Sequence, residues 1–68
     1  METINPDGVE IEVPWREMEV GNSVFIPCFR TFDAALQIKR LGLALNMRFR
    51  TMPKLEGGYR GLRVWRVR

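Results

Sequence analysis

A single helix-type pattern lies in this sequence between strand-type patterns that precede and follow it, and this arrangement limits the folds that the chain can adopt. Its apolar residues recur every three or four positions and so share one helix face: Ala34, Ile38, Leu41 and Leu45. Thr31 is suited to cap the start of this helix, and Asn46 is suited to close its end in the left-handed conformation. Gly42 lies inside the pattern and is expected to weaken the helix. We therefore expect one helix that ends at Leu45.

Four segments have the alternation or composition of strands: residues 9–13, 23–26, 47–52 and 62–67. The Gly-rich segment from Pro53 to Gly61 is expected to be the loop that joins the last two strands into a hairpin. The order of elements is then β-β-α-β-β. This order predicts an α+β fold, in which one helix packs on one face of a small antiparallel sheet.

Chain length and composition exclude several classes of protein. A chain of 68 residues forms a small core, so we expect one domain over residues 1–68, with residues 1–8 as a loose or edge segment. One cysteine and no histidine exclude an internal disulfide, a zinc site and histidine-based catalysis. No membrane-spanning run or signal-peptide layout is present. We expect no enzyme, no catalytic or metal-binding residues, no cofactor and no membrane partner.

Acidic and basic residues are separated along the chain. Residues 1–28 carry six acidic side chains and one basic, a net charge of −5, whereas residues 29–68 carry ten basic and two acidic, a net charge of +8. Nine of the eleven cations are arginine, whose planar fork of donors suits phosphate and carboxylate groups. This separation favours a recognition surface for an anionic partner.

Two blocks of the sequence resemble a known family. Met18–Pro27 reads M-E-V-G-N-S-V-F-I-P, and Gly61–Val67 reads G-L-R-V-W-R-V. Together they resemble a family of short, largely uncharacterised bacteriophage proteins, although Asn22 stands where that family has Asp and Val24 where it has an aromatic residue. The resemblance implies a viral source, a compact accessory protein and a location in the cytoplasm of the infected bacterial host. It implies no particular activity.

Alternation places the candidate binding residues on the last two strands. If Met47 and Phe49 face the helix, their basic neighbours face away from it, because successive strand residues point to opposite sides. Leu62 and Val64 facing inward would likewise leave Trp65 outside. The predicted nucleic-acid-binding residues are Arg48, Arg50, Arg63, Trp65 and Arg66 from the strands, and Lys54 and Arg60 from the loop. Guanidinium groups neutralise phosphates and an indole stacks on bases, which predicts a small regulatory protein that binds nucleic acid, with DNA expected.

Alternative interpretations remain open for these residues. One places Trp65 in the core and pairs the arginines with Glu10 and Glu12 across the sheet. A second function is then a protein-interaction module, which inhibits or redirects a host factor that has an acidic surface. Trp15 is either a lid over the edge of the core or an exposed anchor for such a partner. Unpaired edge strands in so small a sheet also predict a homodimer.

Overall fold

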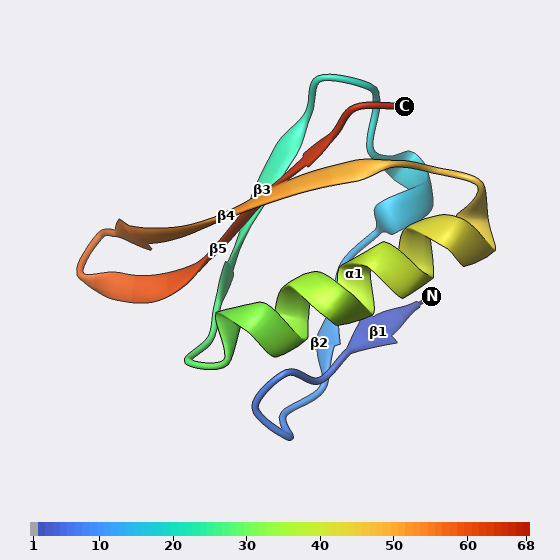
Figure 1. Cartoon of the computed structure of the whole chain (residues 1–68). Coiled ribbons are helices and arrows are strands. Elements are labelled where there is room, and N and C mark those ends of the chain that lie inside the picture. The colour runs from blue at the N-terminus through green and yellow to red at the C-terminus, as the bar shows by residue number, and fades with distance from the viewer. Residues whose placement is uncertain (1) are drawn as a thin grey trace.

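The computed structural model describes residues 2–68, and Figure 1 shows the elements in this range around one long helix. They are β1 (Thr3–Ile4), β2 (Ile11–Glu12), the 3-10 helix η1 (Trp15–Glu17), β3 (Ser23–Pro27), α1 (Thr31–Leu45), β4 (Phe49–Glu56) and β5 (Tyr59–Arg66). The strands form two antiparallel sheets, β1-β2 and β3-β5-β4. The predicted α+β class, with one helix packed on a sheet, is confirmed.

The N-terminal segment differs from its predicted form. Only Ile11–Glu12 of the expected strand over residues 9–13 is extended, and it pairs with β1 in a separate sheet. Val9 is exposed, whereas Ile4 is buried. The expected loose segment therefore contributes a short strand and a core residue, and its first residue, Met1, lies outside the described range. Alternation identified the faces of this strand correctly at Ile11 and Glu12 but carried no information about its partner.

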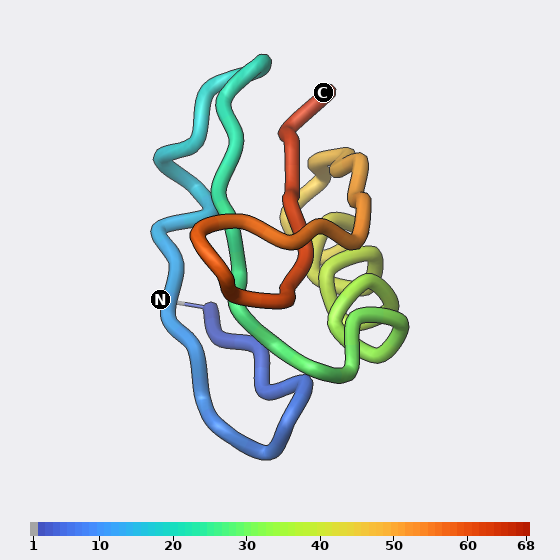
Figure 2. The backbone as a smooth tube through the Cα atoms, turned by 90° about the vertical axis from the view of Figure 1, so that its left-hand side faces the viewer, coloured from blue at the N-terminus to red at the C-terminus, as the bar shows by residue number. Residues whose placement is uncertain are grey.

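The helix α1 and the N-terminal segment together form one layer, which covers a single face of the three-stranded sheet. The helix α1 contacts β4 and β5, and it also contacts β1. In Figure 2 the N-terminal segment runs beside β3 on the left of the view, and the helix lies on the right. The buried core lies between this layer and the sheet: Ile4, Val13, Trp15, Met18, Ile26, Cys28, Ala34, Ile38, Leu62 and Val64. The other face of the sheet has no helix or strand of residues 2–68 packed on it.

The two ends of α1 are formed differently. At the C-terminal end, Asn46 adopts the predicted left-handed conformation (φ 56°). At the start, Thr31 does not cap the helix; Arg30 occupies the cap position without a side-chain bond. The preceding turn is instead held by Asp7, whose carboxylate accepts the backbone N–H groups of Phe29 and Arg30 at 2.9 and 3.0 Å. The helix start thus depends on a residue far away in the sequence.

Gly42 allows the chain to pass close to the helix. A Cβ atom at this position would lie 2.8 Å from the backbone oxygen of Met47 and 3.2 Å from the Phe49 ring. The expected weak point of the helix is instead a place of close packing, where the chain turns back toward β4. The Met47 N–H donates to the Gly42 carbonyl at 2.8 Å.

The predicted loop between the last two strands is wrong. β4 continues through Pro53 to Glu56, and Glu56 pairs directly with Tyr59. Only Gly57 and Gly58 form the turn, and both have positive φ, at 58° and 79°. Positive φ at both central residues is the requirement of a tight type I′ hairpin turn, which glycine meets without strain. Lys54 and Arg60 consequently lie on strands.

Each free edge of the three-stranded sheet carries a proline. Arg66 bonds to the β3 side through its N–H and C=O, and the Arg60 carbonyl accepts from Cys28 on the same side. Successive residues of β5 bond alternately to β3 and to β4. With the observed register, the peptide nitrogens of Pro27 and Pro53 therefore point to the outer edges of β3 and β4. Neither position offers an N–H to a further strand, so edge pairing of two copies is disfavoured. The homodimer stays a prediction.

The sequence blocks Met18–Pro27 and Gly61–Val67 contain neighbouring strands of this sheet. Ser23 pairs with Trp65 and Pro27 pairs with Gly61, so β3 is paired with β5 along the whole length of β3. A Cβ atom at Gly61 would fall on the Ile26 carbonyl oxygen and lie 2.7 Å from the ring of Phe25. Glycine is therefore required where the two blocks meet.

Candidate nucleic-acid interface

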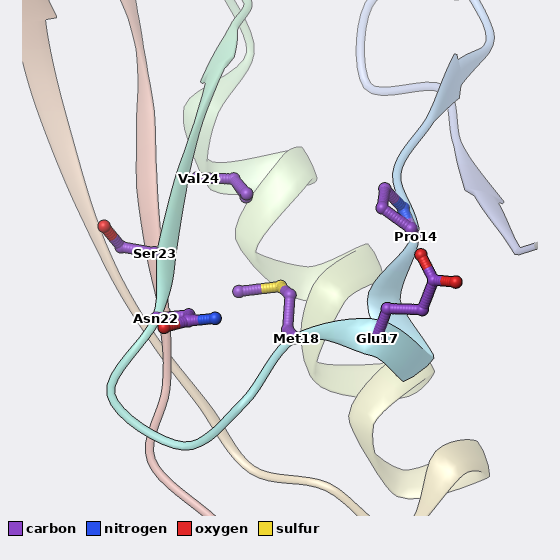
Figure 3. Close-up of a pocket in the computed structure, with 6 residues that line it drawn as sticks. All are labelled: Pro14, Glu17, Met18, Asn22, Ser23 and Val24. Carbon is purple, nitrogen blue, oxygen red and sulfur yellow. The ribbon is translucent and has the colours of Figure 1, made fainter.

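The outer face of the three-stranded sheet, directed away from α1, carries the candidate site. Directly opposed residues of an antiparallel sheet share a face, so Arg50 and Trp65 lie together, as do Met52 and Arg63. The intervening residue Val64 is fully buried on the other face. Figure 3 shows the same alternation on β3, where the labelled side chains at positions 23 and 24 point to opposite sides.

A basic hollow lies on this face around Trp65. It has a volume of about 420 Å³ and is lined by Gly21, Arg50, Met52, Lys54, Trp65, Arg66 and Val67. The indole is half-buried, and the Lys54 ammonium lies 5.7 Å from its ring centroid, within the range of a cation–π contact. Of the two placements considered for Trp65, the structure has the outer face. The core tryptophan is Trp15, which is fully buried.

The cations of the hollow are not neutralised by acidic strands. Among residues 2–68 the salt bridges are Arg16–Glu2 at 2.7 Å and Arg63–Glu56 at 3.2 Å. The alternative pairing of the arginines with Glu10 and Glu12 is therefore wrong, since β2 belongs to the other sheet. Within the described range, the side chains of Arg50 and Lys54 have no carboxylate partner, so their charge is available to an anionic ligand.

Arg66 combines a structural contact with a place in the hollow. Its guanidinium donates to the backbone carbonyls of Met18 and Arg68, and its own backbone is bonded to Gly21 and Asn22. These contacts hold the turn before β3 against the end of β5. The acceptors are uncharged carbonyls, so the positive charge of Arg66 is not cancelled and adds to the potential of the hollow.

Three of the predicted arginines lie outside the hollow. Arg63 shares the outer face but is paired with Glu56. Arg48 lines a groove between α1 and β4 on the helix side of the sheet. Arg60 lines a small hollow at the far end of the sheet, together with Asp7 and Cys28. The structure thus brings together Arg50, Lys54, Trp65 and Arg66 from the predicted set, and it separates the others.

The sequence interpretation missed several residues of this face. Met52 lies in the hollow. Alternation could have identified it, because positions 50 and 52 lie on the same face of a strand. Phe25 and Tyr59 are opposed to Arg63 and Glu56 and so belong to the same face. Phe25 is not identified by the sequence pattern, because the continuous apolar run over residues 23–26 is typical of a strand covered on both faces. Tyr59 is not identified because it lies in the segment that the sequence predicts to be a loop.

Away from the basic hollow, the structure has a second hollow and a buried thiol, Cys28. A second hollow contains one ionisable side chain, Glu17, beside Pro14, Met18 and Asn22 (Figure 3). Burial raises the pKa of the Cys28 thiol, and the negative charge of Asp7 raises this pKa further, so the thiol is protonated at neutral pH. Residues 2–68 contain no cluster of three or more potential metal-binding side chains. No helix in this range is long and apolar enough to cross a membrane.

The outer face therefore presents a compact set of functional groups: an accessible indole, a thioether and three cations around one hollow. Such a set can hold an aromatic ring and the anionic groups attached to it. The chain matches no protein-family model, no curated protein and no solved structure in the three comparisons that were made.

Proposed function

We propose that this protein binds single-stranded nucleic acid through the outer face of its three-stranded sheet. The observation that carries the proposal is the hollow in which Arg50, Lys54 and Arg66 surround the half-buried Trp65. Cations attract the phosphate backbone, and an accessible indole supplies a stacking surface for a base. The neighbouring aromatic residues Phe25 and Tyr59 extend this surface along the sheet.

The indole favours single strands over duplex. A base inside a duplex is already stacked on its neighbours, so a side chain on the surface of a sheet cannot reach its ring face. An unpaired base can enter the hollow while its phosphates contact the surrounding cations. DNA remains the expected partner, and RNA is the alternative with the same chemistry. The bacteriophage origin and the location in an infected bacterium belong to the proposal through the sequence resemblance alone.

The proposal is tested by measuring the affinity for labelled single-stranded DNA, single-stranded RNA and duplex DNA over a series of salt concentrations. With three phosphate contacts, log K should fall against log salt with a slope of about −2 for single strands. Arg50→Ala should reduce the magnitude of this slope by about 0.7. Arg40→Ala is the matched control, because it removes the same charge from α1 on the other side of the sheet.

The two tryptophans allow an independent optical test. Trp15 is fully buried, whereas Trp65 is accessible in the hollow. Binding should therefore quench the emission of Trp65 and leave that of Trp15 unchanged, and acrylamide should lose access to Trp65 in the complex. Binding that does not depend on salt, that is unaltered by Arg50→Ala, or that is stronger for duplex would overturn the proposal.

A further inference from the structure

A groove runs between α1 and the free edge of β4, on the opposite side of the sheet from the hollow. It has a volume of about 650 Å³, and its walls include an apolar set, Phe32, Leu36 and Leu43, and a basic set, Lys39, Arg48 and Arg68. The other flank of the helix is covered, because the Gln37 side chain accepts the backbone N–H of Asn5 from the N-terminal segment at 2.8 Å. The groove flank of the helix, by contrast, is open to solvent.

The open flank of α1 carries a second apolar stripe. The stripe toward the core contains Ala34 and Ile38, which are fully buried. A second stripe, at positions 32, 36 and 43, repeats with helical spacing on the groove side. Phe32 is 85% exposed and Leu43 is 76% exposed. Large apolar side chains gathered at such exposure along one groove are typical of a docking surface.

The positive charge around the groove favours a partner with acidic side chains. Its lining includes three cations and no aspartate or glutamate. A second copy docked by its own groove would bring Lys39, Arg48 and Arg68 of the two chains together, which is unfavourable. A partner with apolar side chains on one face and carboxylates beside them would satisfy both the stripe and the rim.

The free edge of β4 disfavours a partner that binds as an extended strand. Addition of an extended peptide to a sheet requires a row of backbone donors and acceptors on the free edge. Pro53 lies in the middle of β4, and its nitrogen is directed to that edge without a hydrogen. We propose that the groove binds an acidic amphipathic helix of a partner protein, which packs its apolar face on Phe32, Leu36 and Leu43. This inference does not depend on the nucleic-acid site, because the two surfaces share no residue.

The test uses a designed helical peptide with leucines on one face and glutamates beside them. Its matched controls are the same peptide with lysine in place of glutamate, and a proline-containing scramble of equal composition. The glutamate peptide should bind at least about tenfold more tightly than the lysine peptide at low salt, since three rim cations contribute. Binding is measured by fluorescence anisotropy, and the contact residues are mapped from amide chemical-shift changes.

Two exposed positions give variants that should remain folded. Leu43→Glu should weaken binding of the glutamate peptide by more than about tenfold, because it removes an apolar contact and adds a repulsive charge. Lys39→Glu should shift the preference toward the lysine peptide. Arg50→Ala on the outer face should leave peptide binding unchanged, and Leu43→Glu should leave oligonucleotide binding unchanged.

Several outcomes would overturn this inference. Equal binding of the glutamate and lysine peptides would remove the charge argument. No binding of the glutamate peptide, or chemical shifts that place it as an extended strand along β4, would remove the helical partner. A dimer in solution that Leu43→Glu dissociates would assign the groove to a second copy of this chain.

Discussion

The two tryptophans of this protein are placed in opposite environments by the same sheet. Trp15 lies beneath the sheet, fully buried, with its ring edge-on to Phe49 at a centroid distance of 5.5 Å. Trp65 lies on the uncovered face beside Lys54 and is only partly buried. The first residue is therefore available only to the fold, whereas the second has surface to offer a ligand. In this chain of 68 residues, one face of the three-stranded sheet supplies the core and the other face stays uncovered.

The largest expected effect concerns the covered side. Trp15→Ala should cost about 3–5 kcal/mol through loss of buried area and the cavity that remains. This cost is comparable to what a single small core supplies, so the variant should be largely unfolded. Circular dichroism with urea titration measures the loss. A cooperative transition close to that of the parent would show that Trp15 does not stabilise the core.

The next effect concerns the junction of β3 and β5. Gly61→Ala places a methyl group on the Ile26 carbonyl and against the Phe25 ring. Crowding of this kind should cost about 1–3 kcal/mol, because the two strands must separate locally. Lys54→Ala, directly opposite on β4, is the control and should change the urea midpoint little. Equal midpoints for the two variants would contradict the close approach of the strands.

Trp65→Ala tests the uncovered side of the sheet. It should lower the free energy of unfolding less than Trp15→Ala does, because part of the indole is already exposed. Affinity for a single-stranded oligonucleotide should fall about 5- to 150-fold, the range that corresponds to loss of one stacked base. The salt slope should stay that of the parent, because no charge is removed. A changed slope with unchanged affinity would argue against stacking.

The smallest effect concerns the start of the helix. The N–H groups of Arg30 and Phe29 stabilise the ionised carboxylate of Asp7 and hold its pKa below the ordinary value. A lowered pKa in the folded state means stability that is present at neutral pH and is lost as pH falls below about 4. Asp7→Asn should lower Tm at neutral pH, and the difference from the parent should shrink at acidic pH. A constant difference at all pH values would contradict this role.

The sequence predicted the local features of the fold best. The last residue of α1 and the left-handed Asn46 follow from a stripe of apolar residues and a C-terminal signal, both of which act within a few residues. The start of the same helix was predicted wrongly, because its hydrogen-bond acceptor, Asp7, comes from a remote segment. The sequence predicts that a loop begins at Pro53, yet at an edge position the missing N–H of proline removes no hydrogen bond from the sheet, and β4 continues through it.

The candidate site was predicted in part for the same reason. Alternation correctly placed Arg50, Arg63 and Trp65 on the face away from the helix, since this property needs only the direction of each strand. The neutralisation of Arg63 by Glu56 could not be foreseen, because it depends on the exact hairpin register. That register is fixed by the turn at Gly57 and Gly58, which lies within the segment that the sequence predicts to be a long loop.

This two-glycine turn also has a consequence for the order of folding. β4 and β5 are joined by only Gly57 and Gly58, so their pairing closes a very short loop, whereas β3 must find β5 across the whole helix. Hairpins form in about 1–10 μs, and distant strand pairs are slowed by the entropy of closing a longer chain. We expect the strands that carry Arg50 and Trp65 to pair first and to serve as the template on which the rest of the chain assembles.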